Sequence, residues 1–152
     1  TPALLQQGAS ALYATNQVSD AQRCLAETVL SAVGIVAWVE TEPTLDAVTA
    51  LSGSGPAYFF LFMNIMHEVI IKKKFYVKDS RSLIIKNLQG TLEFLEKQNK
   101  SFDKYIELVA SKGGTTEEAL NILKKNNALF NLFNNAILKA TKKSESMGKK
   151  LI

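Results

Sequence analysis

The sequence is poor in the side chains that most often build metal and redox sites. Its 152 residues include one cysteine, Cys24, and one histidine, His67. A single cysteine excludes a disulfide within the chain and fits a reducing compartment. Because His67 lies among Met and Phe residues, far along the chain from Cys24, the pattern predicts neither a bound metal nor a Ser-His-Asp triad. We expect His67 to be a core residue and Cys24 a small buried one.

Long hydrophobic runs are also missing. The longest apolar run, residues 56–71, is shorter than the roughly 20 residues that a bilayer span needs, and it contains polar side chains. The opening residues do not resemble a signal peptide. We therefore expect a buried helix over 56–71, no membrane partner and a cytoplasmic protein.

Arginine is scarce, which bears on nucleic-acid binding. The chain has only Arg23 and Arg81, and all of its lysines follow Ile71, so the formal net charge of +4 is concentrated in the second half. Lysines scattered over helix faces usually form a solvated surface, and no basic stripe with interleaved aromatic residues is present. We expect no nucleic-acid partner.

The G-x-G-x-x-G fingerprint of dinucleotide-binding domains is absent as well. The first part of the chain nevertheless has α/β character. Strands are predicted over 8–15 and 35–39, with a helix between them that begins after Ser19, forms a capping box with Gln22 and ends at Gly34. A single strand–helix–strand piece is too small for a parallel-sheet domain. We interpret it as the tail of a larger α/β domain.

After Pro43 the pattern is helical to the end. The helix predicted over 56–74 is apolar on almost every side and must be covered on every side. The last helix has apolar residues at alternating spacings of three and four, which is typical of lengthwise helix packing. One small domain cannot cover both faces, so we infer a partner chain. The other predicted helices cover 45–51, 79–98 (with a stripe at Ile84, Leu88, Thr91 and Leu95), 102–109 and 115–125, and the last covers 128–151.

Two short motifs favour a ligand site. Residues 52–56, Ser-Gly-Ser-Gly-Pro, predict a tight turn that presents N–H groups at a helix start. Residues 111–116, Ser-Lys-Gly-Gly-Thr-Thr, predict a second helix start, with Thr115 as N-cap and Glu118 completing a capping box. Each motif alone could be a plain turn. Together they would offer N–H groups and hydroxyls to a small carboxylate.

These motifs carry a family resemblance. Residues 46–58, DAVTALSGSGPAY, closely resemble a signature of pyrroline-5-carboxylate reductase. Residues 111–116, followed by Ala-Leu at 119–120, resemble the family's Ser-Pro-Gly-Gly-Thr-Thr motif, with Lys112 in place of the usual Pro. The opening residues 1–3 and Gly8 resemble its Asn-Thr-Pro-Ala segment. The likeness covers essentially the whole chain.

The resemblance implies reduction of 1-pyrroline-5-carboxylate to L-proline with NADPH or NADH, the last step of proline biosynthesis. It implies a mainly α fold, in which residues 1–42 are the end of a Rossmann domain and residues 43–152 form a helical dimerisation and substrate-binding domain. That domain would interlock with a second copy in a homodimer, and dimers of the family often assemble to decamers.

The resemblance also implies the site residues. Thr116 would be catalytic, hydrogen-bonding the ring nitrogen of the substrate and helping to protonate it. Ser54, Gly55 and Pro56 would lie on the nicotinamide side of the pocket. The substrate-binding loop, whose N–H groups would hold the carboxylate together with the serine hydroxyl, consists of Ser111, Gly113, Gly114, Thr115 and Thr116.

Two other functions remain open. Without the G-x-G-x-x-G fingerprint we expect this chain alone to bind the dinucleotide poorly and to be inactive. It could then be a non-catalytic helical dimerisation module, which binding of a proline-like ligand would distinguish. A related dehydrogenase acting on another imine or a β-hydroxy acid is the other alternative, and the Gly-Gly-Thr-Thr loop argues against it.

Overall fold

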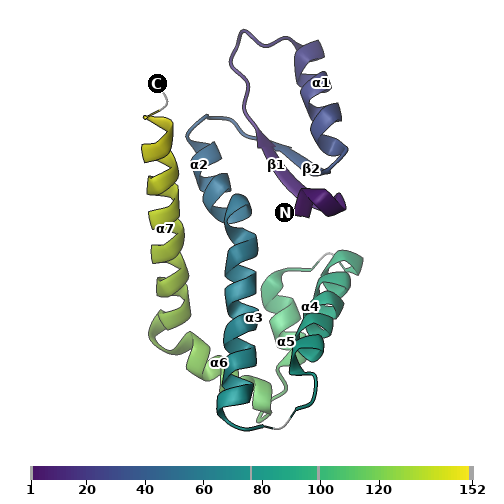
Figure 1. The fold of residues 1–152 in the computed structure, drawn as a ribbon, viewed down its shortest axis with the longest axis vertical. Helices are drawn as coiled ribbons and strands as arrows, with labels where there is room; N and C mark the ends of the chain where they lie inside the picture. The colour runs from purple at the N-terminus through teal and green to yellow at the C-terminus, as the bar shows by residue number, and fades with distance from the viewer. Residues whose placement is uncertain (1, 76, 99, 151–152) are drawn as a thin grey trace. The chain divides into compact units, whose positions relative to one another are not determined.

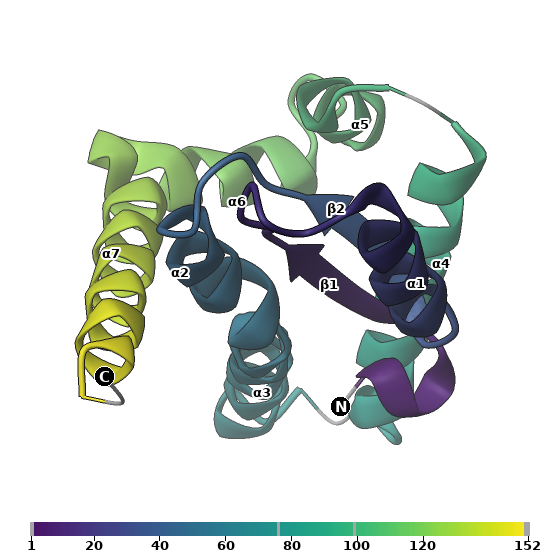
Figure 2. The same cartoon turned by 90° about the horizontal axis from the view of Figure 1, so that it is seen from above.

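The chain begins with two parallel strands joined by a helix (Figure 1). The computed structural model describes residues 2–75, 77–98 and 100–150. After a short 3-10 helix, the strands pair in register from Gly8 opposite Gly34 to Leu12 opposite Trp38, and the connecting helix packs against the second strand (Figure 2). These elements are η1 (Pro2–Leu5), β1 (Gly8–Leu12), α1 (Asp20–Ser31) and β2 (Gly34–Trp38). The predicted strand–helix–strand order is confirmed, although β1 is shorter than predicted.

The start of α1 follows the predicted capping box. The backbone N–H of Gln22 donates to the Ser19 hydroxyl at 3.3 Å, and the Ser19 N–H donates to the Gln22 side-chain oxygen at 2.9 Å. The prediction for the helix end is wrong. The cap residue is Ala32, and Gly34 instead opens β2 with φ of +151°. A side chain at Gly34 would overlap the backbone of Gly8, so this glycine permits close approach of two strands.

The segment after Pro43 is helical but contains an irregular turn. Helix α2 (Thr44–Val48) continues into a π-helical turn, η2 (Thr49–Gly53), which leads into α3 (Gly55–Lys72). Ser54 has helical φ and ψ, and its N–H donates to the carbonyl of Thr49 at 3.0 Å. The tight turn with free N–H groups predicted here is therefore wrong: the π-helical bond engages the Ser54 donor.

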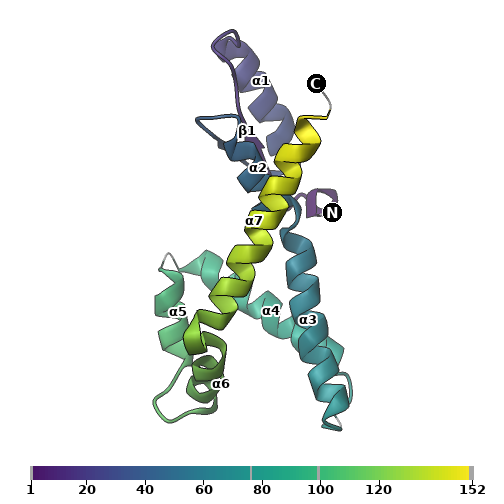
Figure 3. The ribbon, with the colours of Figure 1, turned by 90° about the vertical axis from the view of Figure 1, so that its left-hand side faces the viewer.

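The remaining helices match the predicted ones closely. Helices α4 (Ser80–Lys97) and α5 (Phe102–Val109) precede α6 (Thr115–Lys124), and a 3-10 turn, η3 (Lys125–Asn127), leads into α7 (Ala128–Gly148), as Figure 3 shows. The α4 stripe is half-buried at its leucines and Ile84, whereas Thr91 is exposed and its hydroxyl bonds its own helix. The predicted end of the last helix, Leu151, lies outside the described residues.

The contacts divide the described residues into two units. The first contains residues up to Tyr58 and those from Phe133 onward; the second is Phe59–Leu132. In the first, the Tyr58 hydroxyl donates to the carbonyl of Ala50 at 3.0 Å, and the Tyr58 and Phe133 rings meet edge to face. In the second, His67 is half-buried and shares a hydrogen bond of 2.9 Å with the buried Ser80; the predicted core position is wrong for the single chain, although the imidazole has a hydrogen-bond partner.

Large apolar side chains are exposed on the helices predicted to need a partner. Phe59 of α3 is 61% exposed and Phe130 of α7 is 68% exposed, while Ala50 is the apolar residue that the described chain buries fully, at 1%. Along the predicted α7 seam, Ile137 is half-buried. Cys24 is exposed, so its predicted burial is wrong. Among the described residues no helix is long and apolar enough to cross a membrane.

Candidate functional site

Residues 111–116, called the loop below, run from the connection after α5 into the first two residues of α6, all within the second unit. It turns sharply because Gly113 has φ of +71°, a conformation that favours glycine, and because the N–H of Gly114 donates to the carbonyl of Ser111 at 3.0 Å. Lys112, the residue that replaces the usual Pro, is exposed at the tip of the turn. All the loop residues predicted to bind substrate therefore lie together at the N-terminus of α6.

Gly114 has a second structural role. It is the N-cap of α6, and a Cβ there would overlap the Ser111 hydroxyl and lie 2.9 Å from the Ser111 carbonyl oxygen. The absence of a side chain thus lets the Ser111 hydroxyl lie directly against the start of the helix. A hydroxyl and the partial positive charge of a helix N-terminus at one place suit a small anion.

The capping box predicted for Thr115 and Glu118 is wrong. Thr115 is the first residue of α6 and not its cap, and no side chain bonds in the N-cap position. The carboxylate that reaches back belongs to Glu117, which accepts the N–H of Gly113 at 2.6 Å. The sequence did not single out Glu117 because Glu118 stands next to it. With Gly114 and not Thr115 as the N-cap, the third residue of the helix is Glu117.

Thr116, predicted to be catalytic, lies half-buried at the edge of an apolar cavity of about 690 Å³ in the second unit. Helices α4, α5 and α6 contribute its walls. Tyr105 holds two of them together, since its ring packs edge to face on Phe94 and its hydroxyl donates to the carbonyl of Leu95 at 3.4 Å. Thr116 thus adjoins both the polar loop and an apolar wall, a suitable position for contacting a small ring.

Ser54, Gly55 and Pro56, predicted to contact the cofactor, belong to the first unit. Gly55 is buried, and Ser54 and Pro56 are half-buried. The flanking residue Ser52 donates its hydroxyl to the carbonyl of Ala9 on β1 at 3.2 Å, so part of this motif connects η2 to the sheet. Sequence reasoning had no signal for that contact, because it joins residues 43 positions apart.

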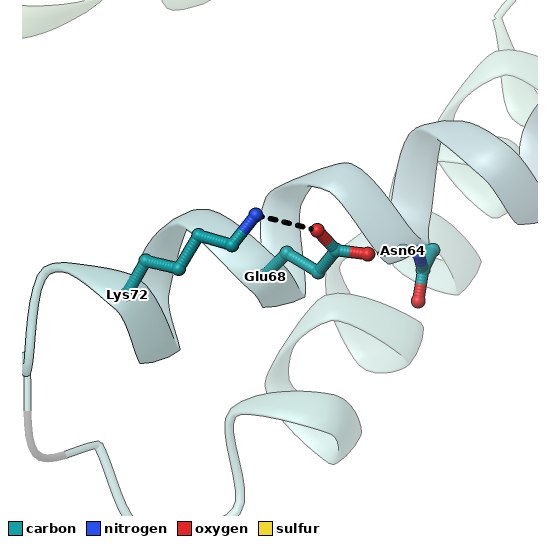
Figure 4. A network of polar contacts seen from close by, with 3 residues as sticks. All are labelled: Asn64, Glu68 and Lys72. Carbon is teal, nitrogen blue, oxygen red and sulfur yellow. Dashed lines mark hydrogen bonds and ion pairs between the residues drawn. The ribbon is translucent and has the colours of Figure 1, made fainter.

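The ion pairs among the described residues lie on exposed helix surfaces. On α3, Lys72 pairs with Glu68 at 3.1 Å, and Asn64 donates to the same carboxylate at 2.8 Å (Figure 4). Hydrogen bonds from Lys72 and Asn64 lower the pKa of Glu68. On α5, the hydrogen bond to Glu107 raises the pKa of Lys104. Within the described ranges, no His, Cys, Asp and Glu side chains gather as a metal site would require.

Comparisons with known proteins agree with this picture. A family model described as pyrroline-5-carboxylate reductase dimerisation matches residues 42–147. A pyrroline-5-carboxylate reductase of Pseudomonas aeruginosa is 43% identical over 126 residues, which cover 83% of this chain and 46% of the relative. That of Pasteurella multocida is 33% identical over 150 residues, covering 98% and 54%. The chain thus spans about half the length of the curated relatives it matches.

Solved structures resemble the fold closely. A pyrroline-5-carboxylate reductase from Coxiella burnetii superposes with a TM-score of 0.87 at 33% identity, covering 96% of this chain and 54% of that one. The pyrroline carboxylate reductase of Plasmodium falciparum, solved with NADP bound, gives a TM-score of 0.82 at 26% identity, covering 97% and 58%.

Proposed function

The chain belongs to the pyrroline-5-carboxylate reductase family, and from this premise we propose that it is the dimerising and substrate-binding part of an enzyme that reduces 1-pyrroline-5-carboxylate to L-proline. The reaction adds a hydride to the carbon and a proton to the nitrogen of a C=N bond. In this proposal residues 1–42 belong to the nucleotide-binding domain and residues 43–152 to the helical domain. The enzyme is cytoplasmic, which the single cysteine suits.

The observation that carries the proposal is the geometry of the loop before α6. The positive φ of Gly113, the bare Gly114 and the adjacent Ser111 hydroxyl bring polar groups together at a helix N-terminus, although the N–H of Gly113 bonds Glu117 and that of Gly114 bonds Ser111 in this structure. These groups would hold the substrate carboxylate. The ring would then lie toward Thr116, whose hydroxyl would hydrogen-bond the ring nitrogen and assist its protonation. Thr115 completes the loop as the first residue of the helix. Catalysis by this part of the enzyme is positioning and electrostatics.

NADPH or NADH, when bound, supplies the hydride. The residues described fit a dinucleotide only in part. The connection from β1 to α1 contains no glycine, so it offers no glycine-rich pyrophosphate loop. Ser54, Gly55 and Pro56 are proposed for the nicotinamide side alone. We expect weak dinucleotide binding and no reductase turnover from the 152-residue chain by itself; turnover by the purified chain would contradict this.

The exposed apolar faces of α3 and α7 support a homodimer. Side chains such as Phe59 and Phe130 are more than half exposed in the single chain, and the matching family model is described as a dimerisation domain. A second copy that interlocks with these helices would cover them. Further assembly of dimers to a decamer is part of the same proposal, with no nucleic-acid or membrane partner.

One experiment tests the proposed site. L-proline is titrated into the isotope-labelled chain and into Thr116→Ala, and backbone amides are followed by NMR. We expect saturable shifts at residues 113–116 that weaken in the variant. A well-folded dimer that shows no shifts would instead favour a non-catalytic dimerisation module. Two internal hydrogen bonds favour that alternative. The hydroxyls of Ser52 and Tyr58 both donate to backbone carbonyls, so part of the motif at 46–58 has a structural role.

A further inference from the structure

Glu117 occupies a hydrogen-bond donor of the proposed carboxylate loop. Its Oε2 atom accepts the backbone N–H of Gly113 at 2.6 Å, which is short for a bond from nitrogen to oxygen. Hydrogen bonds to an ionised carboxylate are both shorter and stronger than neutral ones. In this structure the donor that a substrate carboxylate would use is therefore engaged by a carboxylate of the chain itself.

The position of Glu117 makes this contact a property of the fold. It lies in the first turn of α6, where the helix N-terminus favours a negative charge. It is four residues from Gly113, whose φ of +71° directs the loop back toward the helix. Glu117 is half-buried, whereas the neighbouring Glu118 is exposed and interacts with the loop through its backbone N–H, which donates to the carbonyl of Gly114.

We propose that Glu117 is an internal competitor for the substrate carboxylate. This inference rests on the proposed function of the loop. One N–H cannot serve two carboxylates at full strength, and two like charges at one helix N-terminus repel each other. Binding of the substrate therefore requires the Glu117 side chain to leave Gly113, and the apparent affinity is reduced by the fraction of molecules in which the donor is engaged. Glu117 thus sets the affinity for carboxylate ligands without contacting the reacting atoms.

The competitor also has a selective effect. A ligand without a carboxylate has no use for the Gly113 N–H and gains nothing when Glu117 leaves. A ligand with a carboxylate gains the donor, the helix N-terminus and the Ser111 hydroxyl in exchange. Only ligands that carry a carboxylate can therefore displace Glu117, and until one binds the Gly113 N–H stays bonded to Glu117.

The test uses the 152-residue chain and three variants. Glu117→Gln weakens the internal bond by removing its charge. Glu117→Asp keeps the charge at the helix N-terminus but shortens the side chain by one methylene, which withdraws it from Gly113. Glu118→Gln is the matched control, because it removes the same charge from the same turn. NMR follows the Gly113 amide without ligand, and then during titration with L-proline or with pyrrolidine, which lacks the carboxylate.

We expect the free Gly113 amide to exchange faster with solvent in both Glu117 variants than in the original chain or in Glu118→Gln. We expect L-proline to bind Glu117→Gln about five-fold more tightly, because a neutral hydrogen bond is roughly half as strong as a charge-assisted one. Pyrrolidine should leave the Gly113 amide unchanged in every protein.

Two results would overturn the proposal. The first leaves the proposed function intact, and the second overturns the proposed function as well. If L-proline shifts residues 113–116 in all four proteins but binds Glu117→Gln no more tightly than the original chain, Glu117 is a residue that positions the loop, and the proposed function stands. If L-proline shifts no loop amide even after Gly113 is released, the loop is not a carboxylate site, and the inference and the proposed function fail together.

Discussion

Gly8 and Gly34 face each other at the start of the two parallel strands, with their backbones too close for either to carry a side chain. A Cβ on Gly34 would overlap the carbonyl and amide of Gly8, and one on Gly8 would lie 2.7 Å from the carbonyl oxygen of Val33. The same pair opens the register of the sheet. The contact between β1 and β2 is thus set by two residues that have no side chain.

Replacing either glycine by alanine should destabilise the first unit. We expect Gly34→Ala to lower the free energy of unfolding by about 1–3 kcal/mol, the usual cost of overpacking, because the strands must separate and the φ of +151° is unfavourable for alanine. Urea unfolding followed by circular dichroism measures it. The control is Gly90→Ala in α4, where a Cβ meets no atom within 4 Å; it should raise stability by about 0.5–1 kcal/mol. Equal effects in the two variants would contradict the close approach.

A side chain at Gly114 should reduce ligand affinity more than it reduces the stability of the fold. Gly114→Ala places a methyl group on the Ser111 hydroxyl, so the loop must open and its donors lose their alignment. We expect L-proline binding to fall by about ten-fold or more, the usual effect of a lost charge-assisted hydrogen bond. Gly148→Ala, at a helical position with open space, should bind as the original chain does. Unchanged affinity of Gly114→Ala would exclude the loop as the carboxylate site.

The apolar face of α3 should be sensitive to charge. Phe59→Glu puts an ionised group on a face that the proposed dimer covers, and an unpaired buried charge costs several kcal/mol. We expect dimer dissociation to shift by at least about 100-fold in concentration, measured by analytical ultracentrifugation. Lys73→Glu, past the end of the helix, serves as the control and should leave the association nearly unchanged. A Phe59→Glu chain that dimerises normally would place the interface elsewhere.

Acid should remove a small stabilising contribution from α3. Hydrogen bonds from Lys72 and Asn64 lower the pKa of Glu68 below its ordinary value of 4.5. A lowered folded-state pKa stabilises the protein above the ordinary value, and this gain is lost as the pH falls through the lowered one. In thermal unfolding between pH 6 and about pH 3, Glu68→Gln should therefore show a shallower loss of stability than the original chain. Because the pair is exposed, 0.5 M salt should shrink the difference, and a salt-independent difference would point to a buried contact.

Local signals in the sequence predicted local structure well. The capping box of Ser19 and Gln22 is present, and the helix predicted over 102–109 has those bounds in α5. Such features depend on residues within one or two turns of each other. The motifs within residues 46–58 and 111–116 also identified the family, whose dimerisation model matches 42–147.

What the sequence did not predict depends on distant contacts or on a shift of one residue. The π-helical bond from Ser54 to Thr49 skips one residue more than an α-helical bond, and hydrophobic spacing cannot reveal that. The cap of α6 is Gly114, one residue before the predicted Thr115, and the Ser111 hydroxyl lies where a side chain on Gly114 would be. The exposure of Cys24 depends on what packs against α1, which no pattern within that helix specifies.

The described residues of a single chain bury almost no apolar side chain fully, and this affects the stability of the fold. With Ala50 as the fully buried apolar residue of the described chain, a lone copy buries little apolar surface, and in the proposed homodimer most of the stabilisation would come from the second copy. Folding and dimerisation would then be one event, whose thermal midpoint would rise with protein concentration. In that case dilution would favour unfolding, and a newly made copy would be open to proteolysis until it pairs with another.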